Sequence, residues 1–357
     1  MKNLFNIGIS NVRYKGNNAL LIKLGGNIIY DKATLYEPYE YRGKENIRKV
    51  RTIVNESHDS LDSMFYGCRF LQSVFTEDWD TSNVTNMEGM FNNCWNLPRL
   101  DVSNFNTSNV TRMGYMFRGC LSLTELDVSN FNTSNVIKMN HMFYQCHDLT
   151  SLDVSNFNTN NVDTMYSMFN ECESLTSLDV SNFNTSNVIR MDYMFSGCSN
   201  LTSLDLSNFD TGNVTSMEYM FHTCKLLTSL DLSSFNTSNV TNMYHMFAGC
   251  DLLTELDLSN WNTSNVTKMG YMFYRCNALQ SLDLSNWDIS NVTNTNGMFS
   301  GCNLLQELHL DGCSYDTISK IITSSNFPVD NNGTIYCNKN NAAGLSAPGN
   351  WVFSFID

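Results

Sequence analysis

The sequence predicts an α/β repeat solenoid, a leucine-rich-repeat-like stack of about ten coils with a 26-residue period. Eighteen of the nineteen methionines recur at two fixed positions of this period, three residues apart. Cysteine recurs once per period without insertion or deletion, at Cys68, Cys94, Cys120, Cys146, Cys172, Cys198, Cys224, Cys250, Cys276 and Cys302. A single coil of this length cannot bury its own apolar residues, so a stack with a continuous core is expected.

Each coil combines two hydrophobic periodicities. In the coil from Val84 to Val110, the apolar residues between Met87 and Cys94 follow i, i+3, i+4, i+7, which predicts a short helix. Apolar and polar residues alternate from Leu100 to Ser103, which predicts a strand. Asn106 to Asn109 has the composition of a turn. We therefore expect parallel strands on one face of the stack and short helices on the other.

The period divides the chain into three parts. Residues 61–310 form the predicted solenoid, residues 1–60 an N-terminal cap or attachment segment, and residues 311–357 a C-terminal cap. Two strands joined by a hairpin turn are expected within Ala19 to Lys32. In the C-terminal cap we expect a helix over 315–324 and strands over 333–337 and 351–356. Cys313 and Cys337 lie outside the cysteine series, and whether they pair is left open.

Charge and composition exclude several classes of function. The net charge of -14 and the isoelectric point of about 4.7 argue against a nucleic-acid partner. No apolar run reaches the roughly 20 residues that span a bilayer, so membrane insertion is not expected. The N-terminal MKNLFNIGIS does not read as a signal peptide. Stacked cysteines would be about 4.8 Å apart, too far for a disulfide, so we expect buried, reduced thiols.

An aromatic row is expected on the outward side of the predicted helices. The position between the two methionines of each coil points away from the core. Tyrosine or histidine occupies it at Tyr115, His141, Tyr193, Tyr219, His245 and Tyr271. Tyrosine gives a large contact area at low entropic cost, and flat aromatic rows can stack against sugars, so we expect this row to bind a partner. The alternative is that the rings only shield the edges of the coils.

A row of carboxylates is expected on the strand face. It consists of Asp101, Asp127, Asp153, Asp179, Asp205, Asp231, Asp257 and Asp283. Neighbouring carboxylates about 5 Å apart repel by about 0.8 kcal/mol per pair in water. Hydrogen bonds from residues such as Ser103 and Thr124 are the favoured source of relief, and calcium is the alternative. We expect at most weak cation binding, with no metal centre and no cofactor.

The chain shows no catalytic constellation. None of its six histidines forms a Cys/His or Ser/His pair that stands apart from the repeat, and there is no glycine-rich phosphate loop. Two stacked aspartates could imitate the carboxylate pair of a glycosidase. That chemistry needs unlike environments, whereas repeat positions provide nearly identical ones. A non-enzymatic protein is therefore expected.

The repeat resembles that of the BspA-like leucine-rich repeat family, in its 26-residue, lipoprotein-associated form. The resemblance rests on LTSLDVSNFNTSNV at Leu175 to Val188, followed by M-x-x-M-F-x-x-C at Met191 to Cys198. It covers residues 61 to about 310 and implies a right-handed solenoid, display on a surface and a role in adhesion, without enzyme activity. The chain departs from the family in having Met-Phe where Ala-Phe is usual, as at Met116, and in showing no leader or lipid-attachment cysteine.

These observations together predict a recognition or adhesion protein. The missing leader favours a bacteriophage virion component, such as a tail or receptor-binding protein, that contacts a host cell-surface protein or glycan. Residues 1–60 would then dock to other virion proteins. A bacterial cell-surface adhesin is the first alternative, and an enzyme acting on glycans is an alternative of another class. The expected location is the virion, the cell surface or the extracellular space.

Overall fold

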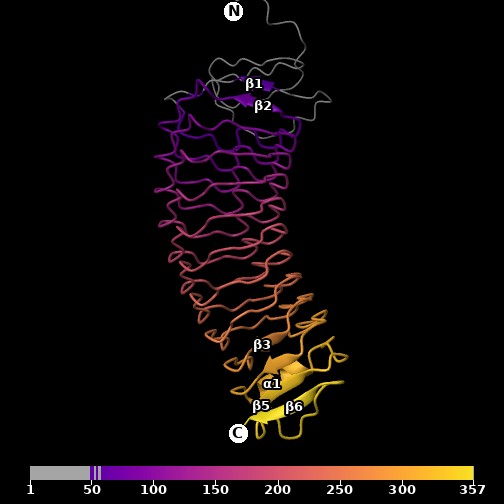
Figure 1. The fold of residues 1–357 in the computed structure, drawn as a ribbon. Helices are drawn as coiled ribbons and strands as arrows, with labels where there is room; N and C mark the ends of the chain where they lie inside the picture. Colours follow the sequence, from indigo (N-terminus) through magenta and orange to yellow (C-terminus); the bar gives the residue numbers. More distant parts are fainter. Residues whose placement is uncertain (1–48, 52–53, 55–57, 357) are drawn as a thin grey trace, which may run out of the picture.

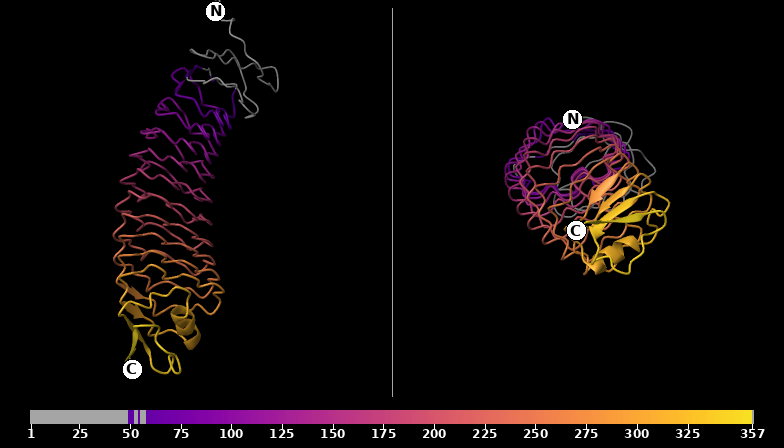
Figure 2. Two further views of the ribbon diagram at one scale, coloured as in Figure 1. Left: turned by 90° about the vertical axis from the view of Figure 1, so that its right-hand side faces the viewer. Right: turned by 60° about the horizontal axis from the view of Figure 1, so that its bottom comes forward.

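Coils of 26 residues stack along one axis into a gently curved solenoid (Figure 1). In this computed structural model the described residues are 49–51, 54 and 58–356. Seen towards the end of the stack, the successive coils overlie one another (Figure 2). The predicted solenoid is confirmed. The hairpin predicted within Ala19 to Lys32 lies outside the described residues.

Regular strands occur only near the two ends of the described stack. Near its start, β1 (Lys49–Arg51) pairs in parallel with β2 (Ser73–Phe75). Near its end, β3 (Ser281–Asp283) and β4 (Glu307–His309) begin a four-stranded parallel sheet. β2, β3 and β4 all lie at the predicted strand position of their coils.

In the middle coils, the expected strands are reduced to isolated parallel bridges. One series of bridges runs coil by coil from Ser60↔Asn86 to Lys268↔Asn294. A further bridge joins Arg99 to Glu125 at the predicted strand position. The predicted parallel pairing of the coils is thus confirmed, but the middle coils form isolated bridges instead of continuous strands.

The predicted short helices are wrong, because two tight turns take their place. The first turn closes where the N–H of Met116 donates to the carbonyl of Met113, at 3.2 Å. The second closes where the N–H of Cys120 donates to the carbonyl of Phe117, at 3.1 Å. The third residue of each turn has a positive φ, as in a type II turn: 60° at Tyr115 and 68° at Gly119. An α-helix does not accept such a residue.

The turns free backbone groups for bonds between coils. Tyr115 N–H donates to the carbonyl of Asn140 at 2.9 Å, and Phe117 N–H donates to that of Met142 at 2.9 Å. The same pattern recurs in the neighbouring coils. An apolar spacing of i, i+3, i+4, i+7 therefore also suits two consecutive turns that bury the same residues and hydrogen-bond to the next coil.

The core is a set of identical residues stacked along the axis. Nine consecutive ring pairs, from Phe65–Phe91 to Phe273–Phe299, have centroids 5.3–5.9 Å apart and interplanar angles of at most 12°. The methionines of these turns from Met87 onwards are fully buried. Because each ring contacts the equivalent rings above and below, every coil depends on its neighbours for burial.

The predicted column of buried, reduced thiols is confirmed. All twelve cysteines are free, and all except Cys68 are buried. Within the column the thiol donates to a backbone carbonyl of the preceding coil, as Cys146 does to Phe117 at 3.2 Å. Cys313 stands one period after Trp287, in a column of phenylalanine and tryptophan, and its thiol lies 3.1 Å from the carbonyl oxygen of Leu284. Cys313 and Cys337 are not paired.

Polar side chains also connect the coils. The buried hydroxyl of Thr107 donates to the carbonyl of Asn132 at 3.0 Å and accepts the N–H of the same residue at 2.7 Å. On the surface, the amide of Asn109 donates to the carbonyl of Ser82 at 2.7 Å. Equivalent bonds recur along the chain and account for the Thr and Asn of the repeat.

The C-terminal segment continues the stack. The predicted helix is present as α1 (Tyr315–Ile322), and the two predicted strands are β5 (Thr334–Asn338) and β6 (Val352–Ile356). β5 and β6 extend the sheet in the order β3-β4-β5-β6. Residue 310 therefore marks the end of the sequence period but not the end of the sheet.

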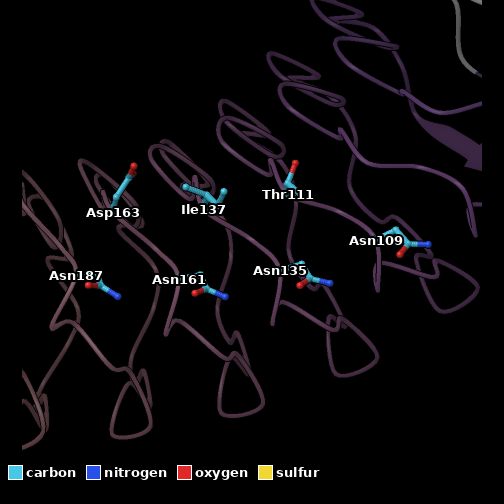
Figure 3. Close-up of a pocket in the computed structure, with 7 residues that line it drawn as sticks. All are labelled: Asn109, Thr111, Asn135, Ile137, Asn161, Asp163 and Asn187. Atoms are coloured by element: carbon cyan, nitrogen blue, oxygen red, sulfur yellow. The ribbon is translucent and has the colours of Figure 1, made fainter.

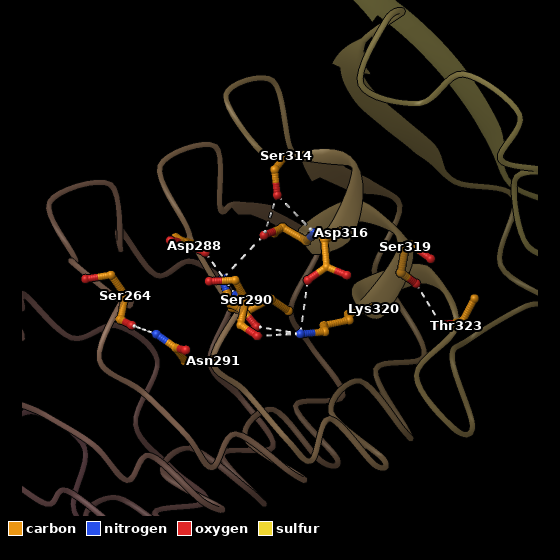
Figure 4. A network of polar contacts seen from close by, with 11 residues as sticks. Ser264, Asp288, Ser290, Asn291, Ser314, Asp316, Ser319, Lys320 and Thr323 are labelled. Atoms are coloured by element: carbon orange, nitrogen blue, oxygen red, sulfur yellow. Dashed lines mark hydrogen bonds and ion pairs between the residues drawn. The ribbon is translucent and has the colours of Figure 1, made fainter.

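Polar contacts hold α1 against the last coil (Figure 4). The hydroxyl of Ser314 caps the helix by accepting the N–H of Thr317 at 3.3 Å. The ammonium group of Lys320 donates to the carbonyl of Ser290 at 2.7 Å and lies 3.1 Å from a carboxylate oxygen of Asp316. Lys320 thus anchors the helix to a turn of the solenoid.

We expect the thiols of the folded protein to resist modification. Burial raises the pKa of Cys120, Cys198 and Cys250 to about 12, so at pH 8 only about one thiol in ten thousand is the reactive thiolate. Ellman's reagent should titrate almost no cysteine in the native state and twelve after unfolding in guanidinium chloride. Rapid native labelling of several cysteines would contradict a closed core.

Candidate functional site: an aromatic ladder on the turn face

The six residues of the predicted aromatic row share one backbone conformation. Each is the third residue of the first turn of its coil, with φ between 56° and 60°. The row comprises Tyr115, His141, Tyr193, Tyr219, His245 and Tyr271. Because the coils repeat, equal backbone angles place these side chains above one another. We call this row, with Tyr166, the aromatic ladder.

The rings stack face to face along the solenoid axis. The centroids of Tyr193 and Tyr219 are 4.7 Å apart with an interplanar angle of 11°. His245 continues the stack at 4.6 Å from Tyr219 and 4.8 Å from Tyr271, with angles of 6° and 18°. Aromatic pairs at these separations attract one another beyond simple burial. The structure therefore brings the predicted residues together as a mutually supporting array.

Tyr166 completes the ladder where the repeat position has no ring. Ser167 occupies this position and is buried. The ring of Tyr166, one residue earlier, lies 4.8 Å from His141 and 5.8 Å from Tyr193. The predicted row does not include Tyr166, because most coils have glycine or a polar residue at the equivalent position of the repeat.

A second layer of rings surrounds His245. Tyr244 meets it edge to face at 4.3 Å, and His222 and Tyr274 do so at 6.0 and 6.4 Å. Together with Tyr219 and Tyr271, five rings enclose one imidazole. This crowding makes the C-terminal half of the ladder its densest part.

The stack decides what the ladder presents to a partner. Ring faces inside the stack are covered by neighbouring rings, so the expectation that a flat aromatic row stacks against sugars is wrong for the interior rungs. All rungs are half-buried. In the described part of the chain, no phenolic hydroxyl of Tyr115, Tyr193, Tyr219 or Tyr271 hydrogen-bonds to protein. The ladder therefore offers ring edges and free hydroxyls.

Burial also keeps the ladder histidines neutral. Desolvation, aided by the positive charge of Arg118, lowers the pKa of His141 to about 4. Desolvation, aided by His222, lowers the pKa of His245 to about 4. Desolvation lowers the pKa of His222 as well. At neutral pH the imidazoles are thus uncharged rungs between phenol rings.

We expect stability to fall as the pH drops from about 6.5 to 4. In that window an unfolded histidine binds a proton, whereas folded His141 and His245 with pKa values of about 4 do not. The unfolded state then holds more protons, so acid favours unfolding. Urea unfolding at pH 7 and pH 4.5 measures the loss.

The double variant His141→Tyr/His245→Tyr is the matched comparison. Tyrosine occupies the same position with the same φ in four other rungs, so the stack is kept while the titrating groups are removed. The variant should lose less stability in acid than the parent chain. An equal loss in both proteins would assign the pH dependence to other groups.

The aspartate row is exposed, and each carboxylate has a local partner. Asp101 accepts the backbone N–H of Ser103 at 2.9 Å, and the same contact recurs through Asp283, which accepts from Ser285. These bonds lower the pKa of Asp101. Thr124, the other expected donor, bonds instead to the carbonyl of Pro98 at 3.3 Å, so that part of the prediction is wrong.

No metal centre stands out in the described part of the chain. There, no group of three or more His, Cys, Asp or Glu side chains is arranged to hold a metal ion. The aspartates lie in a line rather than around a point, whereas calcium takes six to eight oxygen ligands around one centre.

We accordingly expect calcium to leave the stability of the protein unchanged. Thermal melts with excess EDTA and with added calcium chloride should give the same Tm. A Tm that rises on adding calcium would identify the aspartate row as a cation site, and loss of the rise in Asp153→Asn/Asp179→Asn would locate it.

A shallow groove crosses another edge of the coils (Figure 3). Four asparagines form one side of it, and three side chains of mixed chemistry form the other. Its lining residues are Asn109, Thr111, Asn135, Ile137, Asn161, Asp163 and Asn187. The asparagine amides already bond to the preceding coil. Since these amides are engaged and the residues on the other side of the groove vary from coil to coil, the aromatic ladder is the stronger candidate site.

Comparisons with known proteins are consistent with a repeat architecture and do not identify an activity. No curated protein matches the chain. Separately, none of the described helices is long and apolar enough to cross a membrane. One similar structure is a leucine-rich cell surface protein of Faecalibacterium prausnitzii, 17% identical, covering 79% of this chain and 86% of that chain, with a TM-score of 0.32. Another is the complex of TLR13 with ssRNA13, 17% identical, covering 86% of this chain and 39% of that chain, with a TM-score of 0.26. At these TM-scores neither likeness bears on function.

The repeat itself is matched more extensively. The family described as "Mycoplasma protein of unknown function, DUF285" matches residues 59–177, 147–251 and 223–327. These overlapping matches cover the stacked coils and most of the chain. The chain therefore belongs to this DUF285 family.

Proposed function

We propose that this protein is a non-enzymatic recognition or adhesion protein whose aromatic ladder contacts a partner at a cell surface. The observation that carries the proposal is the ladder itself, a continuous row of half-buried rings with free hydroxyls. Tyrosine in such rows supplies contact area with few rotamers to immobilise. The rigid stack adds pre-organisation, because coil-to-coil bonds hold every rung before a partner arrives.

The chemistry of the surface favours binding over catalysis. An acid and a base must differ in environment for general acid–base catalysis. Each carboxylate of the aspartate row instead has the same serine or equivalent partner two residues later. This uniformity supports recognition and weighs against the alternative of a glycan-acting enzyme.

The proposed setting is the surface of a cell. The family description names Mycoplasma proteins, and the BspA-like resemblance implies surface display, so both support a cellular adhesin. The virion setting predicted from the sequence, with residues 1–60 docking to other virion proteins, is the second candidate. The partner in either setting is a cell-surface protein or glycan.

Replacing three rungs should remove binding. In Tyr193→Ser/Tyr219→Ser/Tyr271→Ser the row loses its ring edges and hydroxyls, and binding of the labelled protein to target cells or to a glycan array should fall to background. Serine already occupies this position at Ser63 and Ser167, with φ of 55° and 54°. The backbone is therefore compatible with the change.

The control changes the same number of residues elsewhere on the coils. Asp153→Asn/Asp179→Asn/Asp205→Asn alters the exposed carboxylate row, half a coil away in sequence, and should leave binding unchanged. Circular dichroism and thermal melts establish that both variants remain folded. Full binding by the folded tyrosine variant would remove the proposal.

Location separates the two settings. Labelled antibody against this protein, applied to intact cells and to purified particles, should mark the cell surface. Labelling confined to particles would favour the virion, and labelling of neither would argue against surface display.

A further inference from the structure

The last strand of the described sheet has an unpaired edge. β6 (Val352–Ile356) lies at the C-terminal end of the stack (Figure 1). Among the described residues it pairs with β5 alone, from Thr334↔Val352 to Asn338↔Ile356. Its sequence, VFSFI, contains no charged residue and no proline, although such residues usually protect an edge strand from further pairing. The other edge of β6 is therefore open to an additional strand.

The backbone groups on this open edge belong to Phe353 and Phe355. The N–H of Val352 donates to the carbonyl of Gly333 at 3.0 Å, so the backbone groups of Val352 face β5. Successive residues of a strand direct their N–H and C=O groups to opposite edges. Every second residue from Val352 onwards therefore faces β5, and the N–H and C=O groups of the two phenylalanines point away from it.

The same two phenylalanines carry the core of the sheet to its edge. The strand register places Phe353 beside Ile335 and Phe355 beside Cys337, and both of these neighbours are fully buried. The two rings stack on each other, with centroids 5.9 Å apart and an interplanar angle of 22°. Phe353 is partly buried against the core, whereas Phe355 is 47% exposed. The buried face of the sheet thus ends in apolar rings that β5 covers from one side.

The sequence of β6 is complementary to itself. When two copies pair antiparallel about Ser354, Phe353 of each copy faces Phe355 of the other, and Val352 faces Ile356. Aromatic residues then meet aromatic residues, and branched aliphatic residues meet their like, which are favourable cross-strand pairs. In this register each Phe353–Phe355 pair exchanges both of its outward N–H···O=C bonds. A shift by one residue would set these groups opposite residues whose own groups face β5.

We propose that β6 pairs antiparallel with β6 of a second copy of this chain, about a two-fold axis at Ser354. The pairing continues the sheet β3-β4-β5-β6 across the axis. It also lays the edge phenylalanines of one copy beside those of the other, so it extends the interface through which successive strands of the stack already contact one another. A two-fold interface uses the same surface on both subunits, which is what a self-complementary strand provides.

The side-chain pattern favours a second copy over a strand of an unrelated protein. Any extended segment could satisfy the open backbone groups of the edge. Only pairing with itself makes use of the symmetry of VFSFI about Ser354. The open edge thus commits to one occupant through its side chains.

The size of the contact sets the strength of the dimer. A pair of five-residue strands buries less than the roughly 800 Å² per partner of a standard interface, so the dimer should be reversible and depend on concentration. The dimer does not depend on the proposed recognition function. It would give that function two aromatic ladders on one particle and hence a higher avidity.

Analytical ultracentrifugation of the full chain tests the dimer. With rising concentration the mass of the parent should move from 40.6 kDa towards twice that value. Phe355→Lys should raise the dissociation constant at least about tenfold, because each copy loses a buried ring and gains an ammonium group that must be desolvated. Ile189→Lys is the matched control, since Ile189 lies within the stack and is 51% exposed. It should dimerise as the parent does.

Introduced cysteines test the register. Ser354 faces its own copy in a non-hydrogen-bonded pair, where Cα atoms are about 4.5 Å apart, a separation that a disulfide accepts. Mild oxidation of Ser354→Cys should therefore give a covalent dimer on a non-reducing gel. In the control, Val352→Cys, the two thiols would lie roughly 14 Å apart along the strands and should not cross-link. All native cysteines except Cys68 are buried, so the oxidised parent should run as a monomer.

Three results would overturn the inference. They are a parent chain that stays at 40.6 kDa at every concentration, a dimer that Phe355→Lys weakens no more than Ile189→Lys does, and cross-linking of Ser354→Cys that does not exceed that of Val352→Cys. The cysteine variants decide the question if Phe355→Lys does not fold. None of these measurements involves binding to cells, so a failure here is distinct from a failure of the proposed function.

Discussion

The structure depends on one constraint: backbone N–H groups of each coil donate hydrogen bonds to carbonyls of the next coil instead of to carbonyls of their own coil. Two residues with positive φ in each coil make this possible, since they form tight turns that leave alternate N–H groups directed along the axis. Tyr115 and Gly119 represent these positions, and the carbonyl of Asn140 is one of the acceptors. Non-glycine residues pay a conformational cost for such angles. The backbone hydrogen bonds to the neighbouring coil, which recur in every repeat, offset this conformational cost.

The same constraint explains the composition of the repeat. A coil that bonds to its neighbour must match it in length and register, which favours an unbroken 26-residue period. Identical residues then meet their own copies, so phenylalanine stacks on phenylalanine and each thiol reaches a carbonyl of the preceding coil, as in Phe117 and Cys146. Threonine and asparagine serve the same purpose at the turns and satisfy polar groups that a stack of loops would otherwise bury unpaired.

The surface inherits this regularity and departs from it at only a few positions of the ladder. Most rungs of the aromatic ladder are covered by neighbouring rungs, which makes the ladder stiff and limits contact to edges and hydroxyls. Ser167 and Gly297 interrupt the ring pattern, and nearby tyrosines repair both interruptions. Gly89 is an interruption without such a repair, because no ring lies near its Cβ position.

The sequence by itself determined the solenoid, its period, its buried thiol column and the membership of the aromatic row, because each follows from residues recurring at one interval. It also located α1, β5 and β6, where capping and alternation are local signals. Only the tertiary structure decided that Met113 to Cys120 forms two turns instead of a helix, since an apolar spacing of three and four residues suits both and the acceptors lie in another coil. It alone showed that the rings of the ladder cover one another, because ring orientation depends on the packing between coils, which no single repeat encodes.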